Sequence, residues 1–330
     1  MHRWTGIITI LLTLAGWTAA PLFIRFFYTH IDAWTSNGWR YAVGAVFWLP
    51  LVVVAQVRGT ISPKIWKKAL VPALVNSMGQ VFFTWAHYMI EPGLLTFGLR
   101  VQIIFVAVGA ALLFPAERSV IRRPAFLVGL GLVMMGTMGT GLLDARFGES
   151  STQIGLLFAM TSGALFAAYA LSVRYFMVET PSLHAFGVIS QYTAVTQVAL
   201  MLAFGAGHGS GAFDLSPWLW GMLVFSAIIG IALGHVLYYI SIARLGVAVA
   251  AGVIQLQPFT VGIASLIVFG EHLSSRQWVF GGIAVGGAIL ILHAQRGEML
   301  RRVARRAGKR RSARMAPEAR SSSEDVTIDA

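Results

Sequence analysis

Long apolar segments recur along the whole chain, each separated from the next by a short polar stretch. The clearest covers residues 246–270, which are 25 residues without a single charged side chain. A helix of that length, at about 1.5 Å per residue, is longer than the roughly 30 Å hydrocarbon core of a bilayer. Such segments fall at 6–27, 34–56, 69–90, 93–115, 125–143, 154–176, 185–206, 218–242, 246–270 and 277–294. The pattern predicts an all-α integral membrane protein with ten transmembrane helices.

The composition agrees with a membrane protein and removes one other class. Hydrophobic residues make up 57% of the chain and charged residues 12%, against about 25% charged in soluble domains. A net charge of +12 could indicate nucleic-acid binding, but ten of the 25 Lys and Arg follow residue 295 and most others flank apolar segments. We therefore expect no nucleic-acid partner. Because the chain has no cysteine, it cannot form a disulfide.

The loop charges predict the orientation. If the N-terminus is cytoplasmic, the opposite loops carry only Arg146 and Arg276, with Arg25 at a helix end. Cytoplasmic loops are enriched in Lys and Arg, so we expect a multi-pass protein of the inner cell membrane with both termini in the cytoplasm. On that side lie Arg58, Lys64, Lys67, Lys68, Arg118, Arg122, Arg123, Arg174 and Arg244.

The two halves of the chain share weak similarities in one order. Arg25-Phe26-Phe27 matches 174–176, Arg40-Tyr41 matches 191–192, 79–81 matches 234–236, and Glu117 matches Glu271. The offsets predict two five-helix repeats, residues 1–150 and 151–295, followed by a tail at 296–330. Because five is odd, the second repeat is expected to be inverted relative to the first, as in many secondary transporters.

The second repeat carries a motif series that resembles one family. Residues 234–246 read GHVLYYISIARLG, and Gln257-Pro258, Gly270-Glu271 and Gly281-Gly282 follow. This series is similar to the EamA-type carriers of the drug/metabolite transporter superfamily. The resemblance implies a central cavity lined by both repeats, alternating access, and export of amino acids or other small metabolites. In the first repeat, 91–93 and Arg100 depart from the family pattern.

No motif for catalysis or for a bound cofactor is present. The Gly-rich stretch 205–211 lacks the Lys-Ser/Thr of a phosphate-binding loop, and neither HExxH nor GxSxG occurs. We therefore expect no enzyme activity, no catalytic residues, no cofactor and no metal site. A gradient of the solute or of a coupled ion, such as protons, would then supply the energy.

Two arginines lie within predicted helices. Arg40 is about six residues into the second segment and Arg100 about seven into the fourth, each roughly 9 to 10 Å from the outer end. An arginine at mid-helix costs about 2.5 to 3.5 kcal/mol on insertion scales, so each should find a partner. One possibility is that they reach Asp32, Glu91 or lipid headgroups. The other is that one binds an anionic group of the substrate, and here Arg100 is favoured.

Other polar residues lie at helix depth. Pro258 cannot donate to the Ile254 carbonyl, so we expect Gln255 or Gln257 to line the cavity while the other bonds a neighbouring helix; a structural kink is the alternative. His235 is the candidate for proton coupling, or else a buried neutral histidine. His87, nearer the outer end, is expected to be solvated.

Aromatic and small residues complete the candidates. Aromatic rings at depth can form flat walls for a solute, and the three candidates for cavity walls are Trp17, Trp85 and Tyr238. The glycines at 230 and 234, and at 282 and 286, are spaced for close helix contact. Glu117 and Glu271 are expected to pair with nearby arginines. These residues therefore divide into candidate cavity walls and structural contacts.

The tail after residue 295 places basic residues one helical turn apart, at 301/302, 305/306 and 309/310. We expect this part to bind anionic lipid and the Ser- and acid-rich remainder to be disordered. As a whole, the chain is interpreted as a secondary transporter of a small metabolite. The alternatives are a membrane receptor or sensor and a proton-coupled multidrug exporter.

Overall fold

The computed structural model describes residues 2–114, 122–177, 180–245, 253–254, 256–291 and 293–294. Within these ranges the chain forms helices and connecting loops, and no strand is found. Eight helices or series of helices are long and apolar enough to cross a membrane, and two shorter apolar helices span Gln257–Phe269 and Ser275–Ile291. The all-helical prediction is therefore confirmed, while the count of ten spans stays a prediction.

The helices follow the predicted segments closely. The first half contains α1 (His2–Phe27), α2 (Ala33–Val57), α3 (Lys64–His87), α4 (Pro92–Gly98), η1 (Leu99–Val101), α5 (Gln102–Leu113) and α7 (Pro124–Leu142). The second half contains α8 (Ser150–Phe176), α9 (Ser182–Phe204), η3 (Ala206–Asp214), α10 (Pro217–Ala227), η4 (Ile228–Leu233), α11 (Gly234–Leu245) and α13 (Gln257–Phe269). The helix Ser275–Ile291 follows. Several helices begin at a proline, whose fixed φ suits the first turn.

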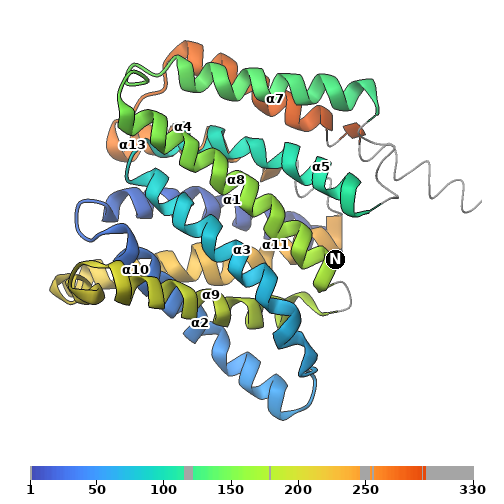
Figure 1. Cartoon of the computed structure of the whole chain (residues 1–330), viewed down its shortest axis with the longest axis vertical. Helices are drawn as coiled ribbons and strands as arrows, with labels where there is room; N and C mark the ends of the chain where they lie inside the picture. Colours follow the sequence, from blue (N-terminus) through green and yellow to red (C-terminus); the bar gives the residue numbers. More distant parts are fainter. Residues whose placement is uncertain are drawn as a thin grey trace, which may run out of the picture.

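The helix contacts repeat between the two halves (Figure 1). Helix α1 packs on α11 and α13, and α8, its counterpart in the second half, packs on α3 and α5. Helix α2 pairs with its counterpart α9, as α4 does with α13. Helix α7 lies against the helix Ser275–Ile291. If the two halves are exchanged, the contacts of α1 therefore correspond to those of α8, and the pairs of counterparts stay the same.

Two of the membrane-spanning series are not regular α-helices throughout. The fourth changes to a 3-10 turn at Leu99–Val101, between α4 and α5. The eighth contains the π-helical segment η4 between α10 and α11. The apolar pattern did not predict either change, because it indicates the length of an apolar segment and not whether its backbone is an α-, 3-10 or π-helix. Irregular backbone at membrane depth is tolerated only where protein or a water-filled cavity surrounds it.

The charged side chains are divided between the two ends of the helix bundle. All described carboxylates lie at the end that we call the carboxylate end, namely Asp32, Glu91, Asp144, Glu149, Asp214 and Glu271. The loops and helix termini of the opposite, basic end carry Arg58, Lys64, Lys67, Lys68, Arg122, Arg123, Arg174 and Arg244. Glu117, Arg118 and the tail after residue 295 lie outside the described residues. The described charges therefore separate as the loop pattern predicted.

The glycine predictions are half right. A Cβ at Gly230 would lie 2.9 Å from the Cβ of Ala20, and one at Gly234 would lie 2.4 Å from Nε1 of Trp17, so both glycines allow close packing. The prediction for 282 and 286 is wrong, because both are exposed. The contacts come instead from 281 and 287, where a Cβ would meet Phe97 and the backbone of Gly129. The helix is thus turned so that a different pair faces its neighbours.

Candidate functional site

Arg100 lies in the break of the fourth series and ties it to α13. Its side chain is buried, and Nε donates to the carbonyl of Thr96 at 3.1 Å. Nη1 donates to the carbonyl of Ile254 at 3.4 Å and Nη2 to Oε1 of Gln257 at 3.1 Å. Because Pro258 has no N–H, the Ile254 carbonyl lacks its usual helical partner, and the guanidinium supplies one. Arg100 therefore joins two interrupted regions of helix.

Gln257 extends this link to the first helix. Its Nε2 donates to the carbonyl of Trp17 at 2.8 Å, while its Oε1 accepts from Arg100. Both ends of the amide are therefore bound by protein, and α1, α13 and the 3-10 turn are held together. Gln257 bonds neighbouring helices, which is one of the two roles expected for the glutamine pair. Gln255 lies outside the described residues.

Trp17, His235 and Tyr238 form an aromatic group beside this link. The Trp17 ring is 5.5 Å from that of His235 and 5.1 Å from that of Tyr238, measured between centroids. His235 also stacks on Phe186 at 4.9 Å, and its Nδ1 lies 3.2 Å from the carbonyl of Ile231 in η4. Since a carbonyl only accepts, Nδ1 carries the proton in this bond. The group joins α1, α9 and α11.

Arg40 lies on α2 and faces η4. Its side chain is 3% exposed, and Nε donates to Oγ of Ser226 at 3.1 Å. The Ser226 hydroxyl donates its own proton to the carbonyl of Leu223 at 2.7 Å, so it acts as an acceptor toward Arg40. Sequence reasoning did not identify Ser226, because a lone serine in an apolar helix gives no signal of its distant partner. Arg40 and Arg100 are thus held by different parts of the second half.

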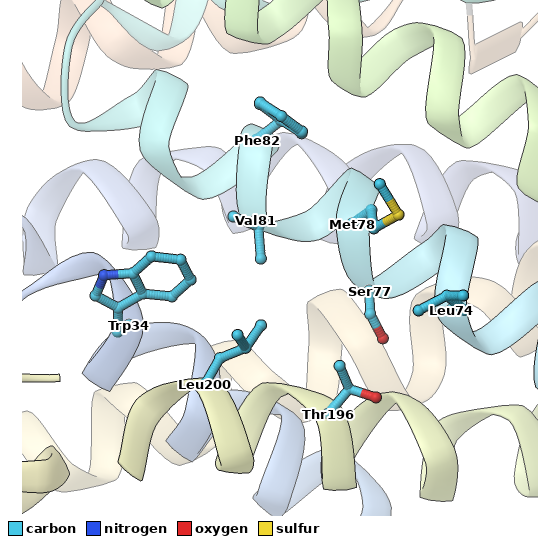
Figure 2. Close-up of a pocket in the computed structure, with 8 residues that line it drawn as sticks. All are labelled: Trp34, Leu74, Ser77, Met78, Val81, Phe82, Thr196 and Leu200. Carbon is cyan, nitrogen blue, oxygen red and sulfur yellow. The ribbon is translucent and has the colours of Figure 1, made fainter. Parts of the chain in front are cut away.

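Trp85 is placed apart from Trp17 and Tyr238. Its ring contacts those of Trp34 and Tyr88, with centroids 5.8 and 6.3 Å away. Trp34 also borders an apolar pocket of about 190 Å³ between α2, α3 and α9. Figure 2 shows Trp34, Val81 and Leu200 around this pocket, together with Ser77 of α3 and Thr196 of α9. The candidate aromatic residues therefore do not form one wall.

The hydroxyls in this pocket do not make it polar. Oγ of Ser77 donates to the carbonyl of Ala73, and Oγ of Thr196 donates to the carbonyl of Tyr192. Each hydroxyl hydrogen is therefore used within its own helix. The pocket can hold apolar groups, but its lining offers no charge for a polar solute.

The carboxylate end is fastened by an ion pair between α1 and the segment after α13. Nε of Arg25 lies 2.9 Å from Oε1 of Glu271, whose other oxygen accepts from Oγ of Ser265 at 2.6 Å. The predicted pairing of Glu271 with a nearby arginine is thus confirmed. Arg25 also donates to the carbonyl of His87 at 3.3 Å. The expectation that His87 is solvated is wrong, because its side chain is fully buried where α1 closes against α3.

A second ion pair at the same end involves Glu91. Its Oε1 lies 2.8 Å from Nη2 of Arg146, and Arg146 also approaches Asp144 at 3.7 Å. Burial raises the pKa of Glu91 above its ordinary value of 4.5, while Arg146 opposes the shift. Asp32 instead caps α2 by accepting from the backbone of Trp34 at 2.9 Å. Both carboxylates that were considered as partners for Arg40 and Arg100 thus have other partners.

Two further observations concern polar contacts and metals. Oγ1 of Thr18 and Oγ1 of Thr260 lie 2.6 Å apart, adding a hydrogen bond between α1 and α13 that sequence reasoning did not identify. Within the described ranges, no group of three or more His, Cys, Asp or Glu is placed to hold a metal ion. The described polar residues at depth are arginine, glutamine, asparagine, histidine and hydroxyl groups. Such groups can bind a small polar or anionic solute by hydrogen bonds.

The apolar helices indicate a multi-pass membrane protein, and the matching helix contacts show two similar halves. Residues 4–142 and 153–293 each match the EamA-like transporter family. The chain therefore belongs to this family, within the drug/metabolite transporter superfamily, whose members are transporters and not enzymes.

Comparison with solved structures agrees on the fold. A structure titled "Crystal structure of protein" aligns with a TM-score of 0.59 at 16% identity, over 88% of this chain and 97% of that one. At that identity the likeness concerns the fold alone. No curated protein matches the chain.

Proposed function

We propose that the chain is a secondary transporter of the inner membrane that moves a small metabolite by alternating access. The solute would be an amino acid, an organic anion or a related compound, and export is the proposed direction. Ten spans would form two inverted repeats around a central path. No enzymatic step is required, since a gradient supplies the energy.

The observation that carries this proposal is the exchange of helix contacts between the two halves. The first helix of each half packs on the third and fourth segments of the other half: α1 on α11 and α13, and α8 on α3 and α5. The second segments also pair, α2 with α9, and so do the fourth, α4 with α13. Such pseudo-symmetry lets two halves rock about a site near the midplane. A receptor that only detects a ligand gains nothing from two matching halves, so the pattern favours transport over sensing.

The proposed orientation can be tested by labelling. Because the chain has no cysteine, single cysteines report their own position. Ser210→Cys, exposed at the carboxylate end, and Lys67→Cys, exposed at the basic end, would be treated in intact cells with a membrane-impermeant maleimide. We expect labelling of Ser210→Cys only, with Lys67→Cys labelled after the cells are opened. Labelling of both in intact cells, or of Lys67→Cys alone, would contradict the proposed topology.

Transport itself can be tested in proteoliposomes. Purified protein would be assayed for uptake of amino acids, organic acids and cationic dyes, with and without a pH gradient. We expect saturable, gradient-dependent movement of at least one amino acid or organic acid. Movement of cationic dyes alone, driven by a pH gradient, would favour a multidrug exporter instead. Specific binding without any movement would favour a sensor.

A further inference from the structure

The guanidinium of Arg40 has more hydrogen-bond donors than acceptors around it. Arginine carries five N–H groups in a planar fork, and one of them donates to Ser226. No hydrogen bond or ion pair is found for Nη1 or Nη2 within the described ranges of the chain. The side chain is nevertheless 97% buried, being 3% exposed. A buried cation with unused donors is a candidate for binding an anion.

The described carboxylates do not supply that anion. Each ion pair found in the described part of the chain joins Arg25 or Arg146 to a residue of the carboxylate end. Leaving a buried charge without a counter-charge costs free energy. Ionisable residues within membrane helices are for this reason a mark of solute or ion pathways. The counter-charge of Arg40 is therefore expected from outside the described part of the chain.

The helix opposite Arg40 presents a glycine to the guanidinium. Gly230, within the π-helical segment η4, has no side chain, and a Cβ there would lie 3.6 Å from Nη2 of Arg40. Single π-helical turns occur frequently at functional sites. The irregular turn and the glycine thus bring backbone, not a side chain, against the fork.

His87 provides a second unused polar atom in the same region. Its Nδ1 lies 2.8 Å from the carbonyl of Phe83 and therefore carries the proton, while Nε2 is buried without a hydrogen-bond partner in the described part of the chain. His87 is close enough to Arg40 for the two to interact electrostatically. Two buried polar side chains from α2 and α3 thus have unfilled hydrogen-bonding positions.

We infer that the Nη groups of Arg40 bind the carboxylate of the transported solute, where α2 meets the end of α3 and η4. The proposal rests on the transport function proposed above and names the class of solute: one that carries a carboxylate. A carboxylate matches the guanidinium fork with two parallel hydrogen bonds. Arg100, whose fork is bound to Ile254 and Gln257, has a structural role in this scheme.

Thermal unfolding of the purified full-length protein in detergent tests the assignment. The probes are acetate, benzoate and succinate, each compared with its neutral amide at constant sodium concentration. A ligand that binds only the folded state raises Tm with its concentration. We expect at least one carboxylate, and none of the amides, to raise the Tm of the wild type. The shift should disappear in Arg40→Gln, be reduced in Arg40→Lys, and persist in Arg276→Gln, which removes an exposed arginine.

The ligand-free proteins give a second readout. Removing an uncompensated buried charge should leave the Tm of Arg40→Gln equal to or above that of the wild type. A carboxylate shift that persists in both Arg40 variants, the absence of any carboxylate shift in the wild type, or a large loss of Tm in ligand-free Arg40→Gln would each overturn the assignment.

Uptake by proteoliposomes separates this proposal from the proposed function. If wild type and Arg40→Gln carry the same neutral solute equally well, transport stands and the carboxylate site is refuted. If the wild type shows the Arg40-dependent Tm shift but carries no solute, the carboxylate site stands and the transport proposal is refuted.

Discussion

Arg40 in α2 and Arg100 in the broken fourth series are both almost fully buried, with 3% and 6% exposure, yet they have different surroundings. Arg100 donates to two backbone carbonyls and a glutamine side chain. Arg40 has one acceptor, Ser226, in the described part of the chain. The comparison teaches that depth alone does not identify a binding arginine. What distinguishes the two is how many donors the protein has already used.

Replacing Arg100 with Gln should give the largest effect. The Ile254 carbonyl and the Gln257 amide oxygen would lose a charged donor at a buried position, and a hydrogen bond to a charged group contributes about 1.5 to 3 kcal/mol. We expect a loss of roughly 3 kcal/mol in the free energy of unfolding, measured by thermal or denaturant unfolding in detergent. If Arg100→Gln were as stable as the wild type while Arg40→Gln unfolded, the two roles would be reversed.

The pair Arg25–Glu271 provides an arginine with a carboxylate partner of its own. Both side chains are largely buried, with 18% and 13% exposure. We expect Arg25→Gln to lower the free energy of unfolding by about 1 to 2 kcal/mol, which lies between the changes expected for Arg100→Gln and Arg40→Gln. The charge-exchanged variant Arg25→Glu with Glu271→Arg should recover part of this loss. A double-mutant cycle on unfolding free energies measures the coupling, and additive losses would show that the pair is not coupled.

Adding a methyl group beside Arg40 should have a smaller effect. In Gly230→Ala the new Cβ would lie 2.9 Å from the Cβ of Ala20 and 3.6 Å from Nη2 of Arg40. Overpacking typically costs about 1 to 3 kcal/mol, and we expect a loss of about 1 kcal/mol with weaker carboxylate binding. The matched control is Gly282→Ala, because that glycine is exposed. Equal effects in both variants would remove the link between Gly230 and Arg40.

The smallest expected effect comes from Glu91, which lies at the carboxylate end and pairs with Arg146, not with Arg40 or Arg100. Its pKa is raised above 4.5 by burial, so the folded protein binds the proton more tightly than the unfolded chain. The stabilising contribution is fully present below about pH 4.5 and is lost as the pH rises through the raised pKa. We expect this contribution to the free energy of unfolding to be less than about 1 kcal/mol, because the partner Arg146 is 38% exposed and solvent screens the pair.

Unfolding as a function of pH measures this contribution. In Glu91→Gln the fall in stability over that pH window should be reduced, and the carboxylate-induced Tm shift at Arg40 should be unchanged. Loss of that shift in Glu91→Gln would show that Glu91 acts on the Arg40 site, contrary to its pairing with Arg146.

Much of the helix arrangement followed from apolar length. The predicted segments 34–56 and 125–143, for example, correspond to Ala33–Val57 and Pro124–Leu142. The breaks at η1 and η4 could not be predicted, because 3-10 and π turns leave the apolar composition unchanged. Rotation about a helix axis was also not fixed, as shown by 282 and 286 facing outward in place of 281 and 287.

The candidate site was predicted only in part. Trp17, Gln257, His235 and Tyr238 are linked through α1 as a group, whereas Trp85 lies with Trp34. The sequence favoured Arg100 as the residue that binds an anion, and the contacts favour Arg40. A lone polar residue in an apolar segment gives no indication of which distant helix will face it.

The sequence by itself determined that the chain is a helical membrane protein of two similar halves. Apolar length, loop charge and repeated residues depend only on the order of residues along the chain. Only the tertiary structure decided which buried arginine is held by the protein and which has unused donors. The partners are Ser226 and Gln257, 186 and 157 positions away from Arg40 and Arg100. Contacts at such separations depend on how the helices pack and rotate, and the pattern along the chain does not encode either one directly.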